Sequence, residues 1–77
     1  MSKPAAPESG WLSWESSNVV GGAYDASGRN LFIRFKGGRV YVYYDVPVSV
    51  WEGIQAAGSK GKYHDQHVKW AFFYDPL

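Results

Sequence analysis

The fold is decided by the stretch Val40–Pro47, which reads VYVYYDVP. Its β-branched and aromatic residues are the ones that favour a strand. Two glycines, Gly37 and Gly38, come just before it, and Pro47 suits the first position of a helix, where its missing N–H costs nothing. The stretch therefore predicts a strand with defined ends that leads into a helix.

A second strand is expected over residues 30–36, because the side chains there alternate between two faces. The face that we expect to point into the core carries Leu31, Ile33 and Phe35. The opposite face carries Phe32, Arg34 and Lys36.

The hairpin between these two strands has two registers open to it. A two-residue loop pairs Phe35 with Val40, whereas a three-residue loop pairs Phe35 with Arg39. The choice decides which tyrosines are buried, because a slip of one residue turns every side chain to the other face. We favour the three-residue loop, with Gly38 in the left-handed conformation. This register buries Tyr41 and Tyr43, and the residues that it turns outward beside Phe32 are Val40, Val42 and Tyr44.

The whole pattern predicts an α+β fold with a three-stranded antiparallel meander, its strands at 19–24, 30–36 and 39–45. Two short helices, at 47–57 and about 60–68, are expected on one face of the sheet. The second helix is expected to bury Tyr63, His67 and Trp70, and residues 71–77 to form an extended segment packed under the helices. The expected core has Trp51 at its rim and consists of Leu31, Ile33, Phe35, Tyr41, Tyr43, Val50, Ile54 and Tyr63.

Length and composition indicate one small domain with an aromatic core. The chain has 77 residues, no cysteine and an aromatic content of 18%, so aromatic burial has to replace the disulfides that many small domains use. We expect a flexible tail over residues 1–15 and the folded domain over 16–77. Trp11 and Trp14 in this tail either fold back onto the domain or bind a partner. With no leader-like or membrane-spanning apolar run in the sequence, we expect a soluble, cytoplasmic protein that makes no membrane contact.

The sequence offers little for catalysis or metal binding. His64 and His67 lie three residues apart, on one side of a helix, but two ligands do not make a metal site and no cysteine is present. We expect one histidine to be packed and hydrogen-bonded and the other to be solvated. No paired carboxylates, activated serine or nucleophile elbow appears. The sequence therefore predicts a binding module that is not an enzyme and uses no cofactor or metal.

One candidate ligand is RNA or another single-stranded nucleic acid. The stretch Gly58–Lys62 combines small residues before a helix start with two lysines, an arrangement that can bind a phosphate. Of the two explanations, the base rate for short charged runs favours a flexible loop with solvated lysines over a phosphate-binding loop. The net charge of only +1 makes the distribution of charge decisive. A nucleic-acid site requires the candidate residues to lie together on one surface. These residues are Arg34, Lys36, Arg39, Ser59, Lys60 and Lys62.

The alternative partner is another protein, or a second copy of this chain in a homodimer. The open sheet face would present an apolar patch formed by Phe32, Val40, Val42 and Tyr44. That face needs cover from the tail, from a second copy of the chain or from another protein. The tail residues Trp11 and Trp14 belong to the same hypothesis.

Four short motifs, in this order, resemble the KTSC domain, named after the C-terminal extension of some bacterial lysyl-tRNA synthetases. They are Ser16-Ser17-Asn18, Tyr41-Val42-Tyr43, Asp45-Val46-Pro47 and Ser59-Lys60-Gly61-Lys62-Tyr63. The resemblance runs from about residue 16 to residue 68 and implies a stand-alone member from a bacterium or phage. It implies no established activity, and RNA binding only through the synthetase context. Val42 stands where the family often has arginine, and residues 70–73 are more apolar than the usual ending. The loss of the arginine beside the tyrosines weakens the case for nucleic acid and makes protein contact a real competitor.

Overall fold

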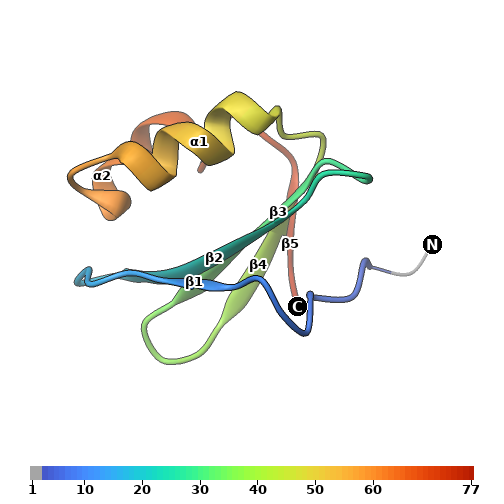
Figure 1. Cartoon of the computed structure of the whole chain (residues 1–77), viewed down its shortest axis with the longest axis horizontal. Coiled ribbons are helices and arrows are strands. Elements are labelled where there is room, and N and C mark those ends of the chain that lie inside the picture. Colours follow the sequence, from blue (N-terminus) through green and yellow to red (C-terminus); the bar gives the residue numbers. More distant parts are fainter. Residues whose placement is uncertain (1–2) are drawn as a thin grey trace.

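A computed structural model describes residues 3–77 and shows two helices lying over one face of an antiparallel sheet (Figure 1). The sheet has five strands in the order β1-β2-β3-β4-β5. The strands are β1 (Leu12–Ser13), β2 (Val19–Asp25), β3 (Asn30–Phe35), β4 (Val40–Tyr43) and β5 (Tyr74–Pro76). The helices are α1 (Val48–Ala56) and α2 (Lys60–His67).

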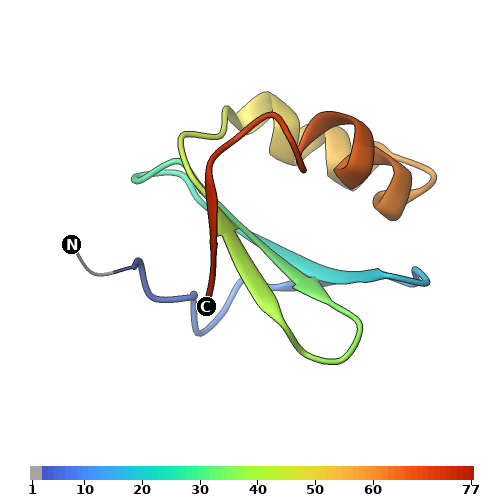
Figure 2. The same cartoon turned by 180° about the vertical axis from the view of Figure 1, so that it is seen from behind.

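The predicted α+β architecture and central meander are confirmed, but the three-stranded sheet is extended by a short strand at each edge. Leu12 of β1 pairs with Gly22 of β2, and Tyr74 of β5 pairs with Tyr43 of β4. Figure 2 shows β5 running beside β4. Segments of two and three residues are too short to show an alternating pattern, which is why the sequence did not reveal them. Residues 71–77 therefore end in the sheet, whereas we expected a segment packed under the helices.

The predicted hairpin register is confirmed. The backbone N–H of Phe35 donates to the carbonyl of Arg39 at 2.8 Å, and Ile33 pairs with Tyr41. The loop is therefore three residues long, and it needs positive φ at both glycines, 98° at Gly37 and 96° at Gly38. With this register Tyr43 is 2% exposed, on the helix side of the sheet.

The main core lies between the sheet and the helices. It contains the predicted residues Leu31, Ile33, Tyr43 and Ile54, together with Val19, Val46 and Val68, which we had not included. The other predicted residues, and Trp51 at the rim, are partly buried against this cluster: Phe35, Tyr41, Val50 and Tyr63.

The buried face of α2 differs from the prediction. His64 is 3% exposed, whereas His67 is exposed and Trp70 is 80% exposed. The reason is the rotation of the helix: His64 and Val68 lie four residues apart, on the one face that meets the sheet. Trp70 follows the end of α2 at His67, in a turn that carries it outward.

The outer face of the sheet is covered by the chain's own N-terminal segment, which is one of the covers that the sequence analysis left open. Phe32 is 1% exposed and Val42 is fully buried, because residues of the N-terminal segment, among them Ala6 and Trp11, pack over them. The ring of Trp11 meets that of Phe32 edge-on with centroids 6.4 Å apart. Ala6, Trp11 and Trp14 of the expected tail therefore pack against the domain, while residues 1–2 of the tail lie outside the described residues.

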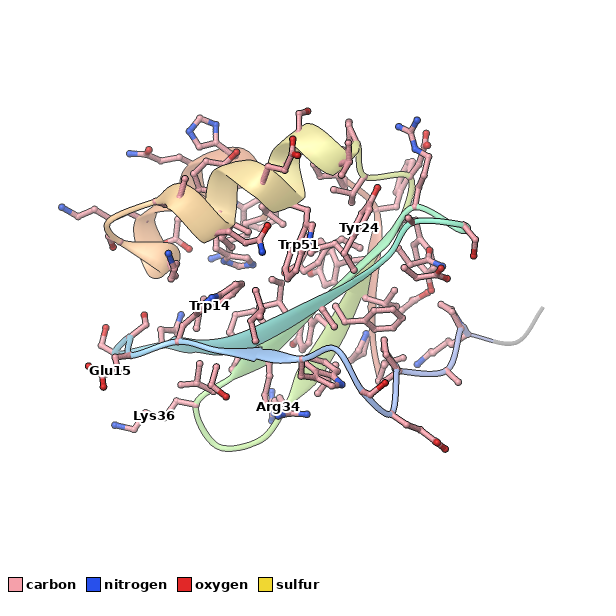
Figure 3. The ribbon with its side chains drawn as sticks, viewed as in Figure 1. Trp14, Glu15, Tyr24, Arg34, Lys36 and Trp51 are labelled. Atoms are coloured by element: carbon pink, nitrogen blue, oxygen red, sulfur yellow. The ribbon has the colours of Figure 1, made fainter. Side chains whose placement is uncertain are left out.

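The two tail tryptophans cover opposite faces of the sheet. Trp14 lies between the sheet and the helices with Tyr24 and Trp51 (Figure 3), its ring centroid 6.1 Å from that of Trp51. Gly22 makes room for it, since a Cβ at this position would lie 2.5 Å from Cη2 of Trp14. Of the two predicted alternatives, the structure shows Trp11 and Trp14 folded back onto the domain.

Candidate functional site

A cavity of about 290 Å³ opens between α2 and the strands β3, β4 and β5. It combines aromatic walls with charged groups. Its lining residues are Asn18, Phe35, Arg39, Tyr41, Tyr43, His64, Asp65, Lys69 and Tyr74.

The walls are formed by a stacked pair of tyrosines. The rings of Tyr41 and Tyr74 lie 5.4 Å apart at an interplanar angle of 12°, and Phe35 meets Tyr41 edge-on at 5.3 Å. Tyr41 is half-buried and Tyr74 is 43% exposed, so both rings line the cavity and remain accessible from it. The pairing of β5 with β4 brings these rings together. In this pairing Tyr74 lies opposite Tyr43, and Pro76 lies opposite Tyr41.

A buried polar pair lies at the inner end of the cavity. The hydroxyl of Tyr43 and Nε2 of His64 are joined by a hydrogen bond of 2.7 Å. Nδ1 of His64 lies 3.4 Å from Oδ1 of Asp65 but makes no hydrogen bond within the described chain. A carboxylate so close to Nδ1 favours the proton on that nitrogen, with the Tyr43 hydroxyl donating to Nε2. This confirms that one histidine is packed and hydrogen-bonded and the other, His67, is exposed.

Both members of this pair are held in their neutral forms. Burial lowers the pKa of His64, Lys69 lowers it further, and Asp65 acts in the opposite direction. Burial also raises the pKa of the Tyr43 hydroxyl well above its usual value. The inner end of the cavity therefore carries no charge near neutral pH.

The lowered pKa of His64 predicts that acid destabilises the fold. In the unfolded chain a histidine has a pKa of about 6.5. In the folded chain the pKa of His64 is lower, so protonation of His64 favours the unfolded chain. The contribution of neutral His64 to stability is therefore complete above about pH 6.5 and is lost as the pH falls from there towards the lowered pKa of the folded chain. We expect the urea midpoint to fall between about pH 7.5 and about pH 5, and His64→Gln to flatten this dependence. His67→Gln removes an exposed histidine and serves as the control. Equal pH dependence in the wild type and His64→Gln would contradict the prediction.

The charged side chains at the cavity are mainly cationic. Arg39 and Lys69 are exposed, and neither forms an ion pair with a carboxylate of residues 3–77. Asp65 is the one acid among the lining residues. The arrangement suits a ligand that has a planar group and a negative charge.

The six predicted nucleic-acid residues do not meet on one surface. Arg39 lines the cavity, but Arg34 and Lys36 project from the side of the sheet that faces away from the helices (Figure 3). Arg34 is stacked over Trp11, with its guanidinium carbon 4.3 Å from the ring centroid. The required convergence is therefore absent.

The Ser59–Lys62 segment is largely occupied in building the helices. Nζ of Lys60 donates to the carbonyls of Gln55 and Ala57, both at 2.7 Å, and so caps the end of α1. Oγ of Ser59 accepts a hydrogen bond from the backbone N–H of Lys62 at 3.3 Å, as an N-cap of α2. The side chain of Lys62 remains exposed.

None of the six predicted protein-interaction residues is fully exposed. Phe32 and Val42 are buried. The half-buried residues are Val40, Tyr44, Trp11 and Trp14. The Tyr44 hydroxyl donates to Oδ2 of Asp75 at 2.6 Å, which raises its pKa to about 12. The chain's own N-terminal segment thus provides the cover that this face needs.

Arg39 is the one lining residue of the cavity that was among the predicted site residues. Phe35, Tyr41 and Tyr43 had been expected in the core, and His64 had been considered as half of a metal pair. The other lining residues had been assigned to no site: Asn18, Asp65, Lys69 and Tyr74. Tyr74 arrives on a strand that the sequence did not reveal, and Lys69 follows the end of α2. One available signal was the basic segment 60–69, in which Lys69 stands beside a run of aromatic residues.

None of the helices in residues 3–77 is long and apolar enough to cross a membrane.

Residues 15–72 match the family model of the KTSC domain. A protein of Tsukamurella paurometabola is 40% identical over 55 residues, which are 71% of this chain and 82% of that protein. The lysine–tRNA ligase of Trichormus variabilis is 35% identical over 63 residues, 82% of this chain but only 11% of the ligase. The crystal structure of a KTSC domain protein from Yersinia pestis superimposes with a TM-score of 0.82 at 29% identity, covering 87% of this chain and 94% of that one.

Proposed function

This chain belongs to the KTSC domain family, and from that premise and the geometry of the cavity we propose that it is a small, non-catalytic module that binds single-stranded RNA. The observation that carries the proposal is the stacked pair of Tyr41 and Tyr74 beside the cations Arg39 and Lys69. Aromatic faces next to unpaired cations are the means by which proteins hold single strands, with bases on the rings and phosphates on the charges.

The size and polarity of the cavity fit one unpaired base. A volume of about 290 Å³ is at the lower end for ligand pockets. A base entering it would meet the rings of Tyr41 and Tyr74, and the amide of Asn18 offers both a donor and an acceptor to a base edge. The neutral pair of His64 and Tyr43 adds no charge that would repel or trap the ligand.

Two further observations support RNA as the ligand and binding as the role. Relatives of this domain form part of lysine–tRNA ligases, which by their name act on a tRNA. The histidine of the cavity, His64, is buried and hydrogen-bonded through Nε2 to Tyr43, so that nitrogen is not free to move a proton for a substrate. The alternative of protein contact through the outer sheet face has less support, because the N-terminal segment covers that face.

Binding to a single-stranded oligonucleotide is expected to weaken as salt rises, and the slope should depend on the two cavity cations. Each phosphate contact on a single strand contributes about 0.7 to the slope of log K against log salt. Replacing Arg39 and Lys69 together by alanine should therefore flatten the slope by roughly 1.4. The measurement is a fluorescence titration of a labelled oligonucleotide at several salt concentrations.

The matched control replaces Lys36 and Lys62 by alanine, because both lysines are exposed and neither lines the cavity. It removes the same charge and should leave the slope close to that of the wild type. No binding by the wild type at about 50 mM salt would refute the proposal. Equal flattening by the two double variants would show that the attraction is diffuse and that the cavity is not its site.

A further inference from the structure

We propose that Trp70 is a second stacking platform. It would hold the nucleotide next to the one in the first cavity, which we call the tyrosine cavity after Tyr41 and Tyr74. This inference rests on the proposed function and specifies its ligand as a strand of at least two nucleotides. Trp70 itself is neither among the predicted site residues nor in the lining of the first cavity.

The observation behind it is a pair of unusually exposed aromatic side chains. Trp70 is 80% exposed and Phe73 is 88% exposed. They lie on the segment between α2 and β5, where a second cavity of about 300 Å³ is lined by residues 69–74. Large apolar side chains gathered on a surface mark a site of interaction.

The second cavity adjoins the first through shared residues. Lys69 and Tyr74 line both of them, and Nζ of Lys69 lies 5.2 Å from the ring centroid of Trp70. A strand with one base against Tyr74 and the next against Trp70 would therefore carry its linking phosphate past Lys69. One cation between two aromatic platforms matches the repeat of a nucleic acid, in which phosphates alternate with bases.

The segment is held at both ends, so Trp70 is positioned by the fold. Val68, two residues before it, is fully buried, and the N–H of Ala71 donates to the carbonyl of Val68 at 3.2 Å. At the other end the carbonyl of Phe73 accepts a hydrogen bond of 2.9 Å from the N–H of Tyr44. The backbone anchors leave the indole of Trp70 directed outward and free to stack.

The local charge favours a nucleic acid over a protein segment as the occupant. The stretch from Lys69 to Tyr74 contains a lysine and no acid. The next residue, Asp75, accepts a hydrogen bond from the Tyr44 hydroxyl. Asp75 pairs in register with Val42, whose side chain packs with Phe32 on the sheet face away from the helices. Its carboxylate is thereby engaged away from the two cavities.

The test compares uridine mono-, di- and tetranucleotides as ligands of the wild type and of Trp70→Ala. We expect the wild type to gain affinity from mono- to dinucleotide, and Trp70→Ala to bind the dinucleotide roughly tenfold more weakly while binding the mononucleotide as before. Trp70→Phe keeps an aromatic face and should recover part of the loss. Tyr41→Ala, at the first platform, should weaken binding at every length.

The outcomes separate the two proposals. If the wild type binds no oligonucleotide, the proposed function fails and this inference with it. If the wild type binds and Trp70→Ala matches it at every length, the second platform alone is refuted. If, in addition, the substitution converts a dimer into a monomer by size-exclusion chromatography with light scattering, the occupant is a second copy of this chain. Thermal melts should be unchanged, because the Trp70 side chain is mostly solvent-exposed.

Discussion

Truncation of Phe32 to alanine is expected to lower the free energy of unfolding by about 3–5 kcal/mol. Phe32 is 1% exposed, although it lies on the sheet face opposite the helices. Its ring packs with Val42 and Ala23 under Trp11, so its removal leaves a cavity that strand β3 and the segment above it cannot easily close. On an open sheet face the same change would cost about 0.5 kcal/mol or less.

The measurement is urea denaturation, with Phe73→Ala as the matched control. Phe73 is 88% exposed, and its truncation should change the stability by no more than about 0.5 kcal/mol. If Phe32→Ala leaves too little folded protein to measure, Phe32→Leu gives a smaller loss with the same sign. Equal midpoints for the variants at positions 32 and 73 would contradict the packed outer face.

Truncation of Ile54 to alanine is expected to cost about 2–5 kcal/mol, much of the stability of a domain this small. Ile54 is the fully buried residue of α1, and it joins the helix to the sheet residues Leu31, Ile33 and Tyr43. The loss combines the transfer of the side chain with the cavity left beneath the helix.

Val48→Ala provides the control within the same helix. Val48 is 52% exposed, so its truncation should have a small effect. Thermal or urea melts of both variants, compared with the wild type, test the assignment. A cooperative melt that Ile54→Ala leaves unshifted would show that α1 does not pack on the sheet through this residue.

The meander and its register could be predicted because their signals are local. The alternation in residues 30–36 and the glycine pair at 37–38 determine the hairpin, and the structure has the three-residue loop. The helices also begin and end close to the predicted residues, with Ser59 as the N-cap of α2. In these segments propensity, spacing and turn chemistry all agree.

The remaining features depend on contacts between segments that are distant in the sequence. The cover over Phe32 comes from the N-terminal segment, whose proline-rich composition is typical of a tail. The rotation of α2 could not be read from its sequence, because a helix with few apolar residues shows no clear buried side; contact with the sheet selects His64.

The candidate site was predicted only in part for the same reason. Arg39 was among the proposed RNA-binding residues, but Tyr41 was assigned to the core and Tyr74 to no site. The cavity exists because β5 brings Tyr74 against Tyr41 and α2 places Asp65 and Lys69 beside them. A residue pattern that becomes contiguous only through tertiary structure has no periodicity in the sequence.

The most direct test of the proposed RNA site is an NMR titration of the full chain with a single-stranded RNA oligonucleotide, following the backbone amides. We predict that the largest shift changes occur at residues of the cavity, above all Arg39, Tyr41, Lys69 and Tyr74, and that Lys36 and Lys62 change little. The absence of shifts, or their concentration around Lys62 or on the outer sheet face near Arg34, would contradict RNA binding at the tyrosine cavity.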